Sequence, residues 1–192
     1  IVDSTALERS LYLTTQLLEL DVKVIVALNM ADVLENKGIK IDTNKLEELL
    51  GVKVLKISAL KGTGIKELVK EIGIINKFST SKIYDANIEN AIDKAIRTLP
   101  RSISHKRFIA IKLFENDERF KALNNVNIKT LVDELSKKYD TDLEEIIATE
   151  RYKFIEGVKQ KTFKKFKREK NVSDKLDKIF LNKLLAFPLF VA

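Results

Sequence analysis

The strongest constraint on the fold comes from two short apolar runs near the N-terminus. VKVIVAL covers residues 22–28 and is apolar except for Lys23, and VKVLKI covers residues 52–57. Runs rich in β-branched residues are typical of strands that are buried on both faces of a parallel sheet. Amphipathic helices are predicted before, between and after them, because apolar residues there recur every three or four positions. This alternation predicts an α/β unit with a parallel sheet, and residues 1–2 are a candidate for the tail of a third strand.

Local signals predict where the first helices begin and end. Thr5 and Glu8 have the spacing of a capping box, in which each side chain bonds the other residue's backbone N–H. The second helix is predicted to be capped near Asp42 and to stop at Gly51. Aspartate accepts from free N–H groups at a helix start, and glycine adopts the left-handed backbone that ends helices.

The character of the sequence changes after residue 75, where no further strand run is found. One helical pattern ends at Pro100 and places six apolar residues on one stripe: Ile88, Ala91, Ile92, Ala95, Ile96 and Leu99. The spacing of Thr141 and Glu144 predicts a second capping box, at the start of a long helix. An all-helical unit is therefore expected after the α/β unit, with a boundary at residues 75–82 and a mostly helical chain overall.

Composition excludes several kinds of site. The 192 residues include no cysteine and one histidine, His105, so neither a disulfide framework nor a thiolate or histidine-rich metal centre is expected. The formal net charge of +7 suits nucleic acid or an anionic membrane surface and does not choose between them. The acidic pairs Asp117-Glu118 and Glu144-Glu145 are interpreted as cap and surface charges. No catalytic group and no metal ligand is assigned.

A basic run, KQKTFKKFKREK, covers residues 159–170. It precedes an apolar segment at the end of the chain, so we favour the cytoplasmic flank that the positive-inside rule predicts. It would also fit the solvated face of a helix with Phe163 and Phe166 packed inward, or a patch that binds RNA phosphates. The apolar segment is shorter than the ~20 residues that span a bilayer, and is a candidate for the first part of such a span.

Polar residues follow both predicted strands. NMAD, residues 29–32, follows the first, and the loop SALKGTG, residues 58–64, follows the second. Open parallel sheets bind ligands beyond the carboxyl ends of their strands, so these loops are expected to lie side by side. We therefore treat Asn29, Asp32, Ser58 and Ala59 as one candidate site.

Guanine is the ligand that this set of groups fits. Its N1–H and 2-amino groups are neighbouring donors, and the Asp32 carboxylate can accept from both in a strong bidentate pair. Adenine has no donor at either place, so it would leave the carboxylate unpaired. Asn29 can donate to the O6 and N7 edge or hold the two loops together, and a backbone N–H of the second loop can bind O6.

A plain structural interpretation also fits Asn29 and Asp32, as a strand-end turn and a helix cap. N-x-x-D alone is common by chance. The second loop, S-A-x-x-G-x-G between another strand and another helix, favours guanine recognition. Leu60, Lys61 and Gly62 are expected to be scaffold more than contacts. The loop residues Met30, Ala31 and Leu60 are nevertheless kept among the candidate nucleotide-binding residues.

These loops resemble those of the second half of a Ras-like GTPase domain. Longer segments are similar, in order along nearly the whole chain, to the ferrous iron transport protein B family: VDSTALERSLYLTTQLLEL, VIVALNMAD, ISALKGTGI, FIAIKLFENDERF, ERYKFIEGV and SDKLDKIFLNKLLAFPLF. The resemblance implies that residues 1–75 are the C-terminal half of a G domain. Residues 76–172 would be a helical regulatory domain, and residues 173–192 a juxtamembrane helix and the start of the first transmembrane span.

The resemblance also implies a function. The intact protein would be a GTP-dependent ferrous iron transporter of the cytoplasmic membrane, with this region on its cytoplasmic side and Fe²⁺ as the transported substrate. GTP or GDP is the implied cofactor, with Mg²⁺ held by parts outside this chain. The helical domain would couple the nucleotide state to the membrane part, and a homo-oligomer is considered.

Two parts of the Ras-like pattern depart from expectation. No G-x-x-x-x-G-K-[ST] run and no Asp-x-x-Gly is present, so this chain alone is expected not to hydrolyse GTP. Met30 stands where many Ras-like proteins have a lysine whose stem covers the base. Methionine covers a ring face without a charge, so weaker nucleotide binding is expected.

Two other hypotheses stay open. A soluble RNA- or ribosome-associated GTPase with a basic C-terminal module would need an RNA-binding unit after residue 75, such as a KH unit with a G-x-x-G loop. No such loop occurs there, and nucleic acid is not expected as a partner. Alternatively, this chain as it stands would act as a non-catalytic helical interaction module attached to an incomplete G domain.

Overall fold

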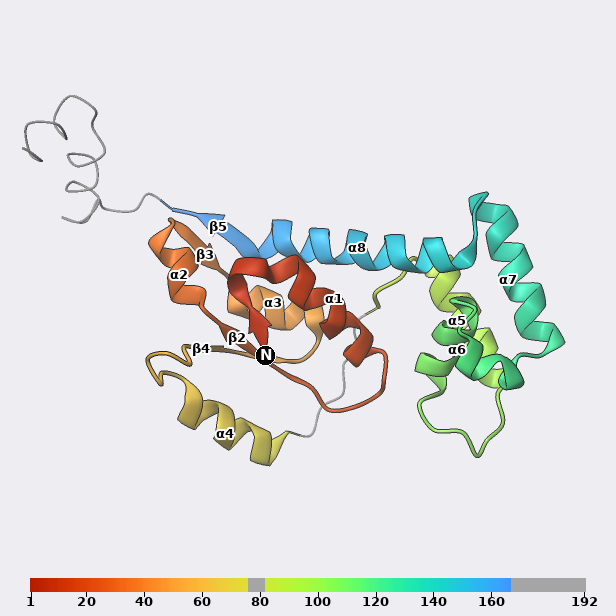
Figure 1. Ribbon diagram of the computed structural model, residues 1–192, viewed down its shortest axis with the longest axis horizontal. Coiled ribbons are helices and arrows are strands. Elements are labelled where there is room, and N and C mark those ends of the chain that lie inside the picture. The colour runs from red at the N-terminus through yellow and green to blue at the C-terminus, as the bar shows by residue number, and fades with distance from the viewer. Residues whose placement is uncertain (76–81, 167–192) are drawn as a thin grey trace, which may run out of the picture.

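The computed structural model describes residues 1–75 and 82–166 and confirms an α/β unit followed by a helical unit (Figure 1). The α/β unit consists of β1 (Val2–Asp3), the 3₁₀ turn η1 (Ser4–Ala6), α1 (Leu7–Leu18), β2 (Ile25–Asn29), α2 (Ala31–Asn36), β3 (Ile39–Ile41), α3 (Thr43–Leu50), β4 (Lys53–Ile57) and α4 (Ile65–Ile74). The rest consists of α5 (Ala86–Thr98), α6 (Lys106–Phe114), the 3₁₀ turn η2 (Glu118–Leu123), α7 (Val126–Tyr139), α8 (Leu143–Thr162) and β5 (Phe163–Lys165). Most of the predicted boundary, and the predicted C-terminal helix and membrane span, lie outside the described residues.

The central sheet is parallel, with the strand order β1-β2-β4. Val2 and Asp3 pair with Leu28 and Asn29, which confirms a third strand at the start of the chain. The middle of β2 is buried because α1 and α3 lie on one side of the sheet and α4 on the other (Figure 1). All three strands end at the same edge of the sheet, which is the edge where parallel α/β folds bind ligands.

The two predicted capping boxes, Thr5–Glu8 and Thr141–Glu144, are wrong, because the structure has other hydrogen-bond partners at both helix starts. Before α1, Asp3 is the capping residue, and its Oδ1 accepts from the Thr5 backbone N–H at 2.8 Å. The chain makes a turn of 3₁₀ helix first, so the α-helix begins at Leu7, one residue later than a box capped by Thr5 assumes. At α8, Thr141 Oγ1 donates to Glu145 Oε2 at 2.8 Å, and Glu144 is not the partner.

The other predicted helix signals are confirmed. Asp42 caps α3 by accepting from the Lys45 backbone N–H at 3.1 Å, and Gly51 ends the helix with a left-handed φ of 65°. The predicted stripe of α5 faces the core of the helical unit, and five of its six members are buried, all but Ile96. That stripe packs against α6 and α7.

Helix α8 joins the two units. It runs from the helical lobe formed by α5, α6 and α7 across the α/β unit, where it packs on α1 and α3 (Figure 1). Its buried side chains recur along the whole helix, among them Ile147, Arg151, Ile155 and Val158. None of the helices in the described part of the chain is long and apolar enough to cross a membrane.

A two-stranded antiparallel ribbon, β3–β5, was not predicted. Ile41 pairs with Phe163, and backbone bonds extend the ribbon from Asp42 N–H to the Thr162 carbonyl (2.9 Å) and from Phe166 N–H to the Gly38 carbonyl (3.0 Å). The expectation of no strand after residue 75 is therefore wrong. The basic run leaves its helix at Thr162, and Phe166 is exposed instead of packed inward. A strand of three residues is too short to show an alternating pattern in sequence. Whether it forms depends on pairing with a segment that is distant along the chain.

Candidate functional site

The two candidate loops start at neighbouring positions of the sheet. In the parallel register of β2 and β4, Asn29 is the partner of Ile57, and Ser58 follows directly. NMAD and SALKGTG therefore leave the same edge side by side, as the parallel-strand argument predicts.

Asn29 connects the loops. Its Oδ1 accepts from the Ala59 backbone N–H at 3.1 Å, and its own carbonyl accepts from the Ser4 hydroxyl at 2.5 Å. Of the two roles considered for Asn29, the structure has the one that holds the loops together. The same bond engages the Ala59 N–H, which was one candidate donor for a base oxygen. Three strand ends are thus fixed to one another through one residue.

Met30 turns the chain from strand to helix and so orients Asp32. Its φ is 63°, a left-handed conformation that is uncommon for a residue other than glycine. Helix α2 begins at the next residue, Ala31, which is buried, and Asp32 lies in the first helical turn. The Met30 side chain is 39% exposed beside this turn.

The Asp32 carboxylate is bound to Lys61 of the second loop. Lys61 Nζ lies 2.6 Å from Asp32 Oδ2, and both side chains are partly exposed, at 34% for Asp32 and 58% for Lys61. The hydrogen bond and charge of Lys61 lower the pKa of Asp32 below its ordinary value, so the group is an anion at neutral pH. The prediction that Lys61 is only scaffold overlooked this contact.

The second loop is closed at its base. The Ser58 backbone N–H donates to the Thr63 carbonyl at 3.0 Å, and the buried Ser58 hydroxyl accepts from the Lys61 backbone N–H at 3.4 Å. Gly64 lies against β4: a Cβ there would be 2.3 Å from the Lys56 carbonyl, so only glycine fits. Leu60 is 95% exposed at the tip and contributes no packing.

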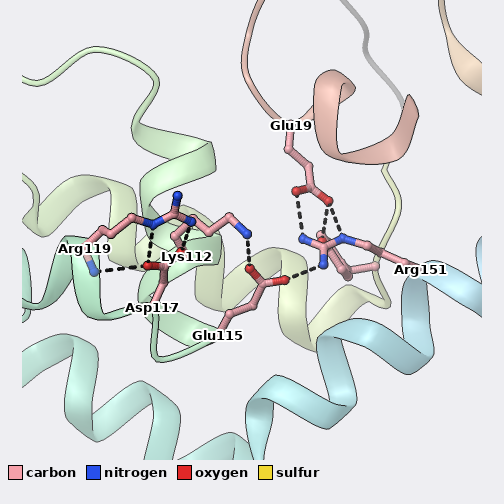
Figure 2. Close-up of polar contacts among 7 residues, drawn as sticks. Glu19, Lys112, Glu115, Asp117, Arg119 and Arg151 are labelled. Carbon is pink, nitrogen blue, oxygen red and sulfur yellow. Dashed lines mark hydrogen bonds and ion pairs between the residues drawn. The ribbon is translucent and has the colours of Figure 1, made fainter. Parts of the chain in front are cut away.

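A second polar centre lies where the helical unit meets α1 (Figure 2). The Arg151 guanidinium of α8 donates from Nε and Nη2 to the two Glu19 carboxylate oxygens, both at 2.9 Å, and from Nη1 to Glu115 at the end of α6. The Tyr84 hydroxyl donates to Glu19 at 2.5 Å. Lys112 Nζ adds a bond to Glu115 at 2.6 Å. The Arg151 and Glu19 side chains are 1% and 0% exposed.

The pKa shifts at this centre follow from burial and the two carboxylates. Burial alone would lower the pKa of Arg151, but the hydrogen bond and charge of Glu19 and the charge of Glu115 raise it overall. Burial and the charge of Glu19 raise the pKa of Tyr84, which therefore stays a donor. His105, the lone histidine, adds a bond nearby, from Nδ1–H to the Leu20 carbonyl at 2.5 Å. His105 is exposed, and its contact here is this hydrogen bond.

Sequence reasoning missed Ser4, Lys61 and Arg151. Ser4 could have been found, because it follows the candidate third strand as Asn29 and Ser58 follow the other two. Lys61 had a weak signal, a cation within the loop opposite an aspartate. Arg151 had none, since its partners Glu19 and Glu115 come from distant parts of the chain and only the fold brings them together.

The acidic pairs are consistent with their interpretation as cap and surface charges. Asp117 accepts from the Arg119 backbone N–H at 3.1 Å at the start of η2, and Glu144 and Glu145 lie in the first turn of α8. Within residues 1–75 and 82–166, no cluster of three or more histidine, aspartate, glutamate or cysteine residues could hold a metal ion.

This fold and edge define a class of protein: a parallel α/β unit of the G-domain type followed by a helical domain. The comparisons agree. Residues 1–72 match the family model described as ferrous iron transport protein B, and residues 84–164 match that of the FeoB cytosolic helical domain. The chain belongs to the ferrous iron transport protein B family.

Individual relatives extend the similarity over the whole chain. The Fe(2+) transporter FeoB of Legionella pneumophila (strain Lens) is 34% identical over 100% of this chain and 26% of its own length. A GDP-bound mutant of the S. thermophilus FeoB G-domain has a TM-score of 0.79 at 39% identity, covering 85% of this chain and 68% of that one. The mGMPPNP-bound NFeoB from S. thermophilus has a TM-score of 0.75, also at 39% identity, over 88% and 68%. This chain spans about a quarter of the length of the curated relatives it matches.

Proposed function

We propose that this chain carries the guanine-reading part of a GTPase that drives a ferrous iron transporter of the cytoplasmic membrane. The observation that carries the proposal is the position of Asp32. Its carboxylate lies at the carboxyl edge of the sheet, is ionised, and is partly open to solvent. The relatives that bind GDP and mGMPPNP support a guanine nucleotide as the ligand.

The carboxylate supplies the recognition. Asp32 would accept the N1–H and 2-amino donors of guanine in one bidentate, charge-assisted pair. Asn29 would fix the distance between the loops through its bond to Ala59, so that the second loop borders the same pocket. Met30 would cover one face of the base with its exposed side chain, while Ser58, Ala31 and Leu60 shape the loops.

The wider function rests on the family. Fe²⁺ is proposed as the transported substrate, and GTP with Mg²⁺ as the nucleotide that powers the cycle. The phosphates and Mg²⁺ would be bound by parts of the protein other than this chain. A homo-oligomer stays an untested expectation.

The structure offers a physical route by which the helical domain would couple nucleotide state to the membrane part. Helix α8 packs on α1 and α3, and polar bonds tie it to the α/β unit at Arg151 through Glu19 and at its end through the β3–β5 ribbon. Because β3 follows α2, a shift of the helix that carries Asp32 would be transmitted to β5, the last described element before the C-terminal segment.

The test of base recognition is Asp32→Asn in the complete G domain that contains this segment. An amide puts a donor where guanine also has donors, so GDP affinity should fall by ~100-fold or more, and XDP should bind better than to the unchanged protein. Kd values for GDP and XDP measure this. Glu35→Gln is the control, a charge change on the same helix at a partly exposed side chain that pairs with Lys56 of β4 and not with the loops. Intact guanine preference in Asp32→Asn would remove Asp32 from its role.

The same variant in the full-length protein extends the test to transport. GTP-dependent ⁵⁵Fe²⁺ uptake should fall at a GTP concentration that saturates the unchanged protein, and recover with XTP. If Asp32→Asn changed nucleotide binding but left Fe²⁺ uptake unchanged, the proposal that nucleotide binding at this site drives iron transport would be contradicted.

We also propose that the chain of residues 1–192 alone does not turn over GTP. It supplies no phosphate-binding loop sequence, and positioning plus charge stabilisation around the phosphates carry most of phosphoryl-transfer catalysis. Phosphate release by the pure chain should equal that of buffer. Steady turnover that Asp32→Ala abolishes would contradict this.

A further inference from the structure

The carboxylate proposed to read guanine already has a partner within the chain. Lys61 Nζ lies 2.6 Å from Asp32 Oδ2, a length typical of a charge-assisted hydrogen bond. We propose that Lys61 is an internal competitor for the guanine base: its ammonium takes the place of the base donors on Asp32, lowers nucleotide affinity and speeds nucleotide release. The proposal rests on the proposed function, because it requires Asp32 to be the base reader.

The chemistry of the two donors makes them exchangeable. An ammonium presents three N–H donors to a carboxylate, and guanine presents two on one edge. The Lys61 contact uses Oδ2, which is one of the two oxygens that a bidentate pair with the base would use, so Lys61 and the base compete for that oxygen. When the base leaves, Lys61 restores a partner to Asp32, and the departing nucleotide does not leave an unpaired anion behind.

The loop allows Lys61 to move in and out. The backbone of the loop is fixed, by Ser58 N–H to the Thr63 carbonyl, by Ala59 N–H to Asn29 and by Lys61 N–H to the Ser58 hydroxyl, but the side chains at its tip are exposed. Leu60 is 95% exposed. Gly62 has a left-handed φ of 67°, and a Cβ there would meet nothing within 4 Å. The Lys61 side chain can therefore rotate away from Asp32 without disturbing the packed part of the site.

Exposure sets the size of the effect. Pairs between partly exposed charges are weak, because solvent competes for both partners. Lys61 would therefore change affinity by about two- to fivefold instead of blocking the site. Salt screens such a pair, so the effect should shrink as ionic strength rises. A competitor of this strength favours release without abolishing binding.

The experiment compares Lys61→Met with the unchanged protein in the complete G domain. Methionine keeps most of the aliphatic stem and removes the ammonium. GDP should bind about two- to fivefold tighter and a fluorescent GDP analogue should dissociate more slowly at low salt, with a smaller difference at high salt. Lys66→Met, an exposed lysine of the adjacent α4, carries the same charge change and should have no effect.

Two further comparisons distinguish failure of the competitor role from failure of the proposed function. In an Asp32→Asn background, Lys61→Met should no longer change affinity for any nucleotide, since the competed carboxylate is gone. Weaker or unchanged GDP binding by Lys61→Met would overturn the competitor role, and weaker binding would mean that Lys61 supports the bound base. If Asp32→Asn itself leaves guanine preference intact, the proposed function fails first, and the competitor role fails with it.

Discussion

Two ion pairs of similar length have different roles in this molecule, one as a fixed contact and one as an exchangeable contact. Arg151 and Glu19 lie 2.9 Å apart and are shut off from solvent, while Lys61 and Asp32 lie 2.6 Å apart at an open edge. The buried pair is bidentate and has further partners in Glu115 and Tyr84. The exposed pair has one bond between one nitrogen and one oxygen. Access to water, more than distance, separates a fixed joint from an exchangeable contact.

The physical difference lies in what happens when one partner leaves. Water can solvate Asp32 if Lys61 moves away, so the contact costs little to open. Glu19 has no such replacement, because an unpaired buried charge keeps its full desolvation cost. The joint between α1 and α8 therefore holds the two units in one arrangement, and the loop edge stays free to exchange partners.

The largest expected effect is at the buried pair. Arg151→Met leaves Glu19 buried and without its guanidinium, and should destabilise the G domain with its helical unit by about 3–5 kcal/mol. Denaturant unfolding monitored by circular dichroism measures this. Lys153→Met, on the same helix but with an exposed side chain, should leave the midpoint unchanged. A loss below about 1 kcal/mol would mean that the joint is not rigid.

A double variant separates stability from coupling. Glu19→Leu with Arg151→Met replaces the pair by apolar groups and should recover most of the stability, because neither charge is left behind. If the joint carries the proposed coupling, the double variant should still alter the rate of GDP release from the full-length protein. A recovered fold with an unchanged release rate would limit the joint to a structural role.

A smaller effect on stability is expected at Asp85, which is partly buried. It caps α5 by accepting from the Asn87 and Ile88 backbone N–H groups at 2.8 and 3.0 Å, and it accepts from the Tyr139 hydroxyl of α7. Partial burial opposes its ionisation, but these hydrogen bonds outweigh burial, so the pKa of Asp85 lies below the ordinary value of 3.8.

The sign of the pH effect follows from that depression. The folded state holds the Asp85 proton less tightly than the unfolded chain, so its contribution is present above about pH 4 and is lost as the pH falls through the folded pKa. Asp85→Asn should cost about 0.5 kcal/mol at pH 7 and make the acid loss of stability shallower. Unfolding curves between pH 7 and pH 2 test this, with Asp93→Asn on the exposed face of α5 as the control. An unchanged acid slope would remove Asp85 from this role.

The sequence predicted those parts of the fold whose signals are local. The β-branched runs around Val26 and Val54 identified the strands, and the last apolar residue of each run indicated where the strand ends. The stripe from Ile88 to Leu99 identified a helix face in the same way. Short-range rules failed where an unusual turn intervened, as at Asp3, where a 3₁₀ turn displaced the predicted cap.

The sequence predicted that the two candidate loops would leave the sheet side by side, but it did not predict the contacts between them. Asn29, Asp32 and Ser58 follow from the rule that parallel strands end at one edge. That Asn29 holds Ala59, and that Lys61 occupies Asp32, depends on how the two loops bend after leaving the sheet. Those bends are set by the left-handed backbone at Met30 and by the close approach of Gly64 to β4.

The sequence by itself determined the α/β order, the helical second unit, the two loops and the family resemblance, because each is written in neighbouring residues. Only the tertiary structure decided the β3–β5 ribbon and the Arg151 joint. Their partners are far apart along the chain, and a three-residue strand or a single arginine has no pattern of its own. Burial then gave the two similar ion pairs their different roles, and burial depends on the whole fold.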